Sequence, residues 1–207
     1  RDSLLLTKLL FFMKKLLLVA GCLIGYIGSS GGKGVGRYIG AESTRKNSSF
    51  PVYEVYNYSL REFIYLAEEM GDGALIGDIT SISFLQADKR SDVRKFSVYI
   101  KHTDKENFLN GNDWVRFTED DCYLKSTDVI YHGVDREWAV LTFDKPFKYE
   151  GGNIVVGLFD ETGSFKHQVD FYSYVTSKLR RCIGHDRDAA PYDPANPGVS
   201  GSFVPYV

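Results

Sequence analysis

Residues 141–160, LTFDKPFKYEGGNIVVGLFD, predict a strand, a turn and a second strand. Branched and aromatic side chains fill both flanking runs, and such side chains suit a pleated sheet. Pro146 lacks the amide donor that a sheet ladder uses, while Gly151, Gly152 and Asn153 readily adopt the positive φ angles of a turn. The stretch therefore predicts antiparallel β structure, and no catalytic motif lies beside it.

The same kind of pattern recurs along the chain. Phe96, Val98 and Ile100 alternate on one face of a predicted strand over residues 93–102. Further strands are predicted over residues 52–58, 76–86, 128–131, 137–143, 153–159, 169–175 and 179–183. A short helix or turn is predicted near residues 60–70, where apolar side chains fall at helical spacing. Short strands at this spacing predict an all-β fold, an antiparallel β-sandwich that is jelly-roll-like.

The beginning of the chain has the pattern of an export signal. Met13 is followed by Lys14 and Lys15 and then by an apolar run that ends at small residues near Ser30. A positive start, a short apolar stretch and a small-residue exit are typical of a secretory signal peptide over residues 1–30, with Met13 as the true start. The sequence therefore predicts a secreted or cell-surface protein.

Cys22 gives the export signal a second interpretation. Val19-Ala20-Gly21-Cys22 resembles the lipobox of bacterial lipoproteins, in which this cysteine becomes lipidated. Ordinary cleavage near Ser30 fits the spacing better, because only five apolar residues separate Lys15 from Gly21. A lipid on Cys22 is the one expected attachment to a membrane.

After the signal, the composition predicts a linker and then one domain. The glycine-rich and polar residues 31–50 are typical of a flexible tether, and they lack the Gly-Lys-Ser/Thr of a phosphate loop. Residues 51–207 then form the sandwich domain, which is long enough for a real core. The ending at residues 201–207 reads as a strand just beginning, so a C-terminal truncation is expected.

Charge and cysteine content narrow the classes of partner. The net charge is −2, from 25 basic and 27 acidic side chains that are mixed along the chain. No basic stripe exists to neutralise phosphates, so nucleic acid is not an expected partner. Cys122 and Cys182 follow the signal, and an exported pair can form a disulfide, although two separate buried thiols are the favoured interpretation.

Acidic loop residues raise the question of a metal ion. Asp160 and Glu161 are the best candidate ligands, because extracellular sandwiches hold Ca²⁺ through loop oxygens. No Asp-x-Asp-x-Asp-Gly loop is present, so ordinary solvated turn residues are favoured over a calcium site. No other cofactor is expected.

Aromatic residues near polar loops define a candidate ligand face. Sugars stack on flat aromatic rings and are oriented by nearby amide, carboxylate and guanidinium groups. The candidates for such a face are Trp114, Tyr123, Tyr131 and Tyr192, whereas Trp138 lies in an alternating strand and is expected in the core. For Trp114, packing against the protein is the simpler alternative to ligand stacking.

Catalytic patterns do not emerge from the sequence. His102, His132, His167 and His185 are scattered, with no His-Glu-x-x-His spacing and no Gly-x-Ser-x-Gly elbow. A pair of carboxylates could hydrolyse glycosides, but nothing singles out a pair. The chain is therefore expected not to be an enzyme.

A family resemblance rests on the order of several short motifs. They are SLREFIYLAEEMG at 59–71, ITSISF at 79–84, VYIKHT at 98–103, VIYHG at 129–133, WAVLTF at 138–143, YEGGNIVV at 149–156 and DETGS at 160–164. Together they resemble a β-sandwich module of large secreted and cell-surface, adhesin-like proteins of Bacteroidetes-type bacteria. The resemblance covers about residues 53–203 and implies binding or spacing rather than catalysis.

The expected function is thus a non-catalytic secreted or cell-surface module of the adhesion type. Its expected partner is a glycan or a host or cell-surface protein. The main alternative is a carbohydrate-binding module, and an accessory domain of a glycoside-acting hydrolase is a third class.

Overall fold

The computed structural model describes residues 22–27, 35–39, 45–71, 76–174 and 179–204, with the backbone alone for 22–27 and 35–38. The strands are β1 (Cys22–Ile27), β2 (Val35–Ile39), β3 (Lys46–Asn47), β4 (Tyr58–Tyr65), β5 (Gly77–Leu85), β6 (Ser91–Thr103), β7 (Cys122–His132), β8 (Trp138–Tyr149), β9 (Asn153–Asp160), β10 (Phe171–Tyr172), β11 (Cys182–Arg187) and β12 (Ser202–Phe203). The helical elements are α2 (Ala67–Met70) and the 3₁₀ turn η1 (Glu119–Asp121).

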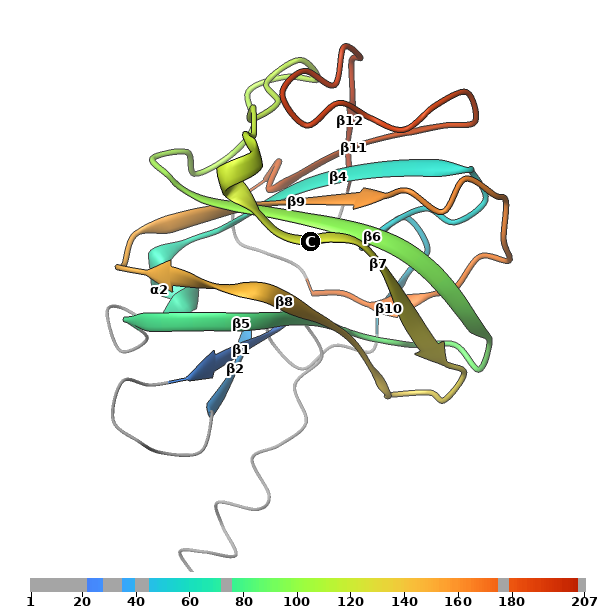
Figure 1. The fold of residues 1–207 in the computed structure, drawn as a ribbon, viewed down its shortest axis with the longest axis horizontal. Coiled ribbons are helices and arrows are strands. Elements are labelled where there is room, and N and C mark those ends of the chain that lie inside the picture. The colour runs from blue at the N-terminus through green and yellow to red at the C-terminus, as the bar shows by residue number, and fades with distance from the viewer. Residues whose placement is uncertain (1–21, 28–34, 40–44, 72–75, 175–178, 205–207) are drawn as a thin grey trace, which may run out of the picture.

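Two antiparallel sheets lie face to face (Figure 1). The larger sheet has the strand order β12-β11-β4-β9-β6-β7, and the smaller has the order β2-β1-β5-β8. The strand pairs are nested, because β6 pairs with β7, β5 with β8 and β4 with β9. This wrapping of one pair around the next is the arrangement of a jelly roll, so the predicted all-β sandwich is confirmed.

The central strands β4 and β9 of the larger sheet are buried on both faces. The inner face of this sheet packs against the smaller sheet, where Phe63, Val98 and Val156 belong to the main core. Its outer face carries a second apolar cluster that includes Ile64 and Phe159. Side chains alternate between the two faces of a strand, so a strand covered on both sides carries a continuous apolar run, as β9 does over residues 154–159.

The strand, turn and strand predicted over residues 141–160 correspond to β8, the turn that follows it, and β9. The turn lies at residues 150–152, where Gly151 and Gly152 have φ angles of 99° and 81°. Pro146 precedes the turn and lies inside β8, where the pairing with β5 shifts register. A proline is tolerated at such an irregularity because no ladder hydrogen bond is lost there.

Three predicted segments differ from the structure. Residues 52–57 are turns rather than a strand, and β4 begins at Tyr58. The short helix is present but begins at Ala67, because residues 58–65 pair with β9 and β11. The expected linker contains β2, which pairs with β1, and β3, which pairs with β10. It also contains the buried Phe50, whose ring packs against Phe63.

The predicted export signal lies largely outside the described residues. Its last part coincides with β1, which pairs with β2 and β5. A run of branched apolar residues suits a sheet as well as an export signal. Export, and cleavage or lipidation of the signal, therefore stay predictions. Among the described residues, no helix has both the length and the apolar character that spanning a membrane requires.

Candidate functional site

Two long loops form a layer over the outer face of the larger sheet. The first loop, residues 104–118, follows β6, and the second, residues 188–201, follows β11. Both lie above the sheet in Figure 1. Phe108 and Phe117 from the first loop and Tyr192 from the second are buried in the outer cluster. Burying apolar side chains against a sheet fixes the loops in place, so they form a rigid third layer.

The two loops are tied to each other directly. The amide of Gly201 donates to the carbonyl of Gly111 at 2.7 Å, and the amide of Phe117 donates to the carbonyl of Pro194 at 3.0 Å. The indole Nε1 of Trp114 donates to the carbonyl of Val199 at 2.8 Å. Gly111 permits this approach, because a Cβ at that position would overlap the carbonyl oxygen of Gly201.

A groove of about 300 Å³ runs between the tied loops. Its lining includes Asn112, Trp114, Arg116, Asn196, Val199 and Ser200. Trp114 is half-buried, with its indole nitrogen engaged and its ring packed against the outer cluster. The groove therefore has one fixed aromatic wall, and its volume is at the lower end of the range of small-ligand sites.

Polar groups around this wall are free to bind. The side chains of Asn112, Asn196 and Ser200 are exposed and make no hydrogen bond with any described residue, and neither does the guanidinium of Arg116. The backbone amides of Asn112 and Asn196 are in contrast used within their own turns. The groove thus offers two amides, a hydroxyl and a cation next to an indole.

A buried carboxyl group supports the first loop from below. Glu62 on β4 is fully buried, and its Oε2 accepts a hydrogen bond from the amide of Val115 at 2.8 Å. Burial raises the pKa of Glu62 to about 8, although Lys105 and Lys101 favour the charged form. Its Oε1 has no hydrogen-bond partner among the described residues. Glu62 therefore holds the residue between Trp114 and Arg116.

The four aromatic residues that the sequence proposed as one ligand face are not brought together. Trp114 lines the groove, whereas Tyr192 is 5% exposed, and its hydroxyl lies 2.7 Å from Nδ1 of His185. Tyr123 packs on the main core, with its ring against Phe147 and below the ammonium of Lys145. The prediction of an exposed ligand-binding ring is therefore wrong for Tyr192, which packs inward. Tyr123 lies on β7, outside the groove.

Tyr131, which was also predicted to belong to the ligand face, lies in the core instead. It is 1% exposed, and its ring packs against Phe96 and Phe171 inside the sandwich. Tyr131 lies on the inward-facing register of β7, so it belongs to the core. Its hydroxyl neighbours Glu54, whose own burial raises its pKa to about 8. Trp138, expected in the core, is instead only partly buried beside a small separate cluster.

The proposed calcium ligands Asp160 and Glu161 are engaged by the protein itself. Asp160 is buried, pairs with the buried Arg94, and accepts hydrogen bonds from the amide and hydroxyl of Thr162. Glu161 accepts from the hydroxyls of Ser97 and Ser126. The prediction that Asp160 lies in a loop is wrong, because Asp160 is the last residue of β9 and its side chain is buried. The described residues contain no group of three or more ligands that could hold a metal ion.

The two cysteines that follow the signal are free thiols on opposite faces of the larger sheet. Cys182 belongs to the main core between the sheets, and Cys122 packs against the outer cluster. The sheet separates the two thiols in the structure, where Cys182 is buried and Cys122 is half-buried. Burial raises the pKa of Cys182 to about 12. The side chain of Cys22 lies outside the described residues.

A second hollow lies at the turn between β8 and β9. It measures about 450 Å³, and its lining includes His102, Asp104 and Gly152. The imidazole of His102 lies flat against the ring of Tyr149, at 5.9 Å between centroids and 7° between planes. This hollow therefore has no free aromatic wall of the kind that Trp114 provides.

Sequence reasoning found Trp114 but missed its neighbours in the groove. Arg116, Asn196 and Ser200 are polar loop residues, and more than 70 positions separate Arg116 from the other two. Only the fold places them together. The composition of the first loop is the local signal that indicates Trp114, because turn-forming asparagine and glycine residues at 110–112 precede an isolated tryptophan.

Comparison of the chain with protein-family models finds no match, and comparisons with curated proteins and with solved structures find none either.

Proposed function

We propose that this chain is a non-catalytic binding module of an exported protein, and that it binds carbohydrate in the groove beside Trp114. The proposal rests chiefly on one observation, a fixed indole that lines a groove together with side-chain amides and a hydroxyl that have no described partner. No carboxylate among the described residues contributes to the lining of this groove. The proposal therefore assigns the site no acid–base chemistry.

The arrangement suits sugars for two physical reasons. The C–H face of a pyranose is apolar and packs on an aromatic ring, while its hydroxyls need donors and acceptors around the rim. Asparagine amides and the Ser200 hydroxyl supply both kinds of group. The loops that carry them are tied together and held on a sandwich, so little ordering entropy opposes binding.

The proposal is tested by substituting the two tryptophans in turn. We expect the unmodified protein to bind at least one glycan on a broad array, and W114A to lose about tenfold or more in affinity, because the stacking surface is removed. The matched control is W138A, since Trp138 is half-buried on β8, outside the groove. W138A should bind the same glycan normally.

A second variant distinguishes a loss of glycan binding from a loss of folding. N196A removes an exposed amide, so its circular dichroism and melting temperature should match those of the unmodified protein, while its affinity falls several-fold. A glycan that binds equally well to W114A, N196A and the unmodified protein would contradict the site. If no glycan binds at all, the carbohydrate proposal is wrong and a protein-contact role of the adhesion type takes its place.

A further inference from the structure

We infer that the groove selects acidic sugars, with Arg116 binding the sugar carboxylate. This inference rests on the proposed function and adds the class of ligand. It comes from Arg116, the one charged side chain that the described part of the chain contributes to the groove lining.

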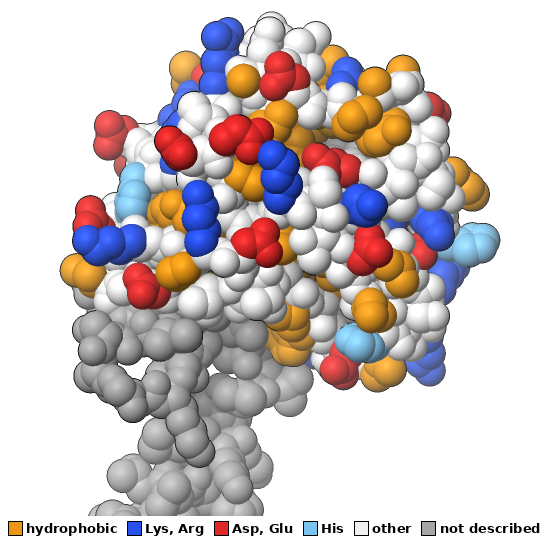
Figure 2. All heavy atoms as spheres, viewed as in Figure 1, with side chains coloured by type: hydrophobic (Ala, Val, Ile, Leu, Met, Phe, Trp, Pro, Cys, Tyr) orange, Lys and Arg blue, Asp and Glu red, His pale blue; other side chains and the backbone are white. Residues whose placement is uncertain are grey.

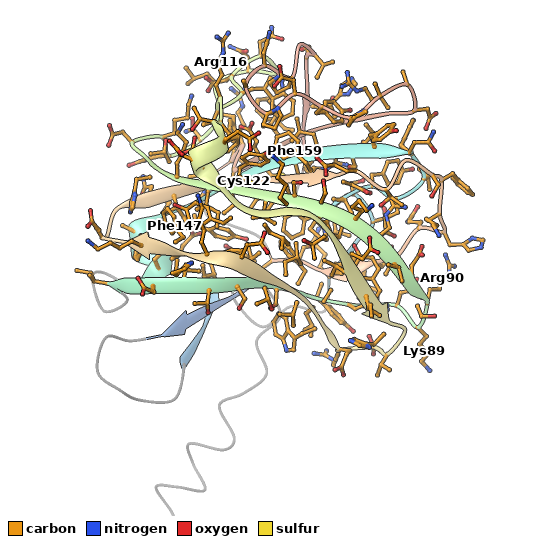
Figure 3. All side chains as sticks on the ribbon, viewed as in Figure 1. Lys89, Arg90, Arg116, Cys122, Phe147 and Phe159 are labelled. Atoms are coloured by element: carbon orange, nitrogen blue, oxygen red, sulfur yellow. The ribbon has the colours of Figure 1, made fainter. Side chains whose placement is uncertain are left out.

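Arg116 is presented on a fixed backbone. Its carbonyl oxygen accepts a hydrogen bond from Nζ of Lys101 at 2.9 Å, and the next amide, of Phe117, donates to Pro194 at 3.0 Å. On its other side, the amide of Val115 donates to buried Glu62. The backbone is therefore held on both sides while the side chain is exposed, and Figure 3 shows Arg116 on the loop layer at the upper edge of the molecule.

The guanidinium of Arg116 is uncompensated, in contrast to Lys105 of the same loop and to cations on the strands that the loops follow. Lys105 pairs with Asp113 at 2.6 Å, and Lys101 pairs with Asp121 at 3.2 Å. Arg187 donates to carbonyls of the second loop and lies over the ring of Tyr192. Arg116 has no ion pair or side-chain hydrogen bond with any described residue, so its charge is available to a ligand.

The chemistry of guanidinium favours a carboxylate as the matching group. Arginine presents a planar fork of donors that binds a carboxylate through two parallel hydrogen bonds. Because no acidic side chain of the residues that the structure describes lines the groove, an anionic ligand meets no like charge from them there. A pyranose that carries a carboxylate on its ring, such as a uronic acid or a sialic acid, places a flat ring for Trp114 and an anion for Arg116 on the same residue.

The inference is tested with pairs of glycans that differ in one group. Each acidic glycan is compared with the same glycan whose carboxylate has been converted to a carboxamide. The unmodified protein should bind the acidic member about tenfold or more tightly, and raising the salt concentration should reduce that preference. R116Q should lose the preference, so that its affinities for the two members become equal, whereas R116K should keep part of the preference because the charge remains without the planar fork.

The control substitution is R90Q. Arg90 is another exposed arginine, far from Arg116 in Figure 3, in the turn before β6. R90Q lowers the net charge by the same amount, so it separates a local contact from a general effect of charge. The acidic preference of R90Q should equal that of the unmodified protein.

Each remaining outcome has a definite meaning. Glycan binding without an acidic preference, or an equal preference in R116Q, overturns this inference and leaves the proposed function standing. Loss of neutral and acidic binding together in folded R116Q also overturns it, because Arg116 would then act on the shape of the groove. Absence of binding to any glycan contradicts the proposed function itself. Equal binding of an acidic peptide in competition with the glycan would overturn the assignment to sugars.

Discussion

Glu62, like Glu54, has a pKa well above the range that is usual for glutamate. Its carboxyl group is fully buried, and burial raises its pKa from 4.5 to about 8. Between these two pH values the folded protein keeps the proton that the unfolded chain releases. The contribution of Glu62 to stability is therefore fully present below pH 4.5 and is lost as the pH rises to about 8.

We expect E62Q to weaken this pH dependence. In the unmodified protein, the free energy of unfolding should fall with rising pH, and Glu62 contributes at most about 1.4 kcal/mol per pH unit to that slope. Glutamine cannot titrate, so E62Q should show a shallower slope between pH 5 and pH 8. Chemical denaturation at several pH values measures both slopes, and Glu54 supplies the same background in each protein. Equal slopes would contradict the prediction.

The same residue shows a limit of sequence reasoning. The sequence predicts a short helix or turn near residues 60–70, and that prediction gives Glu62 no role. In the structure, β4 is covered on both faces, so Glu62 lies under the first loop. A charged residue in a strand gives no local sign that a distant loop covers it. Its burial could not be predicted without the fold.

Among the elements, the tie between the two loops depends on close contact of their backbones. The amide of Gly201 donates to the carbonyl of Gly111, and a side chain at Gly111 would overlap the carbonyl oxygen of Gly201. No flexible side chain can move aside to relieve that overlap, because the obstructing atom belongs to the backbone. The loops must separate to admit a methyl group.

We therefore expect G111A to be destabilised by about 1–3 kcal/mol, the usual cost of forcing extra volume into a packed region. Its affinity for the glycan should fall as well, since the groove is built from both loops. The matched control is G152A, because a Cβ at Gly152 would meet no atom within 4 Å, although its φ of 81° carries some strain. G152A should retain the affinity for the glycan. Unchanged stability and binding in G111A would show that the loops are not coupled.

The strands differ in how well the sequence predicted them. β8 and β9 were predicted from alternation and from the glycine turn between them, and both are present. β4 was missed in part, because its apolar residues also fit a helical spacing. The continuous apolar run of β9 did hold the information that both faces of the larger sheet are covered.

At the scale of the whole molecule, the distribution and pairing of charges bear on whether the protein binds a metal ion. Figure 2 shows acidic and basic side chains interspersed over the viewed face. The carboxylate of Asp160 is already neutralised by Arg94, and that of Glu161 is held by two serine hydroxyls. A calcium ion at this place would have to displace contacts that are already made.

We expect thermal unfolding to be insensitive to calcium. The melting temperature should be the same within error in excess Ca²⁺ and in excess chelator, because an ion stabilises a fold only when it binds the folded state preferentially. Mg²⁺ at the same concentration controls for ionic strength. A rise in melting temperature with Ca²⁺ alone, reversed by chelator, would contradict the prediction and restore a metal site.

The sequence predicts the sandwich but does not predict the nested pairing of its strands. Composition and alternation predicted a sandwich, yet the contact of β4 with β9 spans about a hundred positions and has no local signal. The assembly of the groove likewise has no local signal in the sequence. Trp114 could be selected as a candidate from its loop, but Arg116 and Asn196 gain their meaning only from the topology that joins their loops.

The tied loops have a practical consequence for antibodies and inhibitors. The groove surface is a discontinuous epitope, because residues 112–116 and 196–200 come together only in the folded chain. A linear peptide that copies either segment lacks the other wall. Antibodies raised against such peptides, or against denatured protein, should therefore fail to block the groove, whereas reagents selected on the native protein can recognise both loops at once.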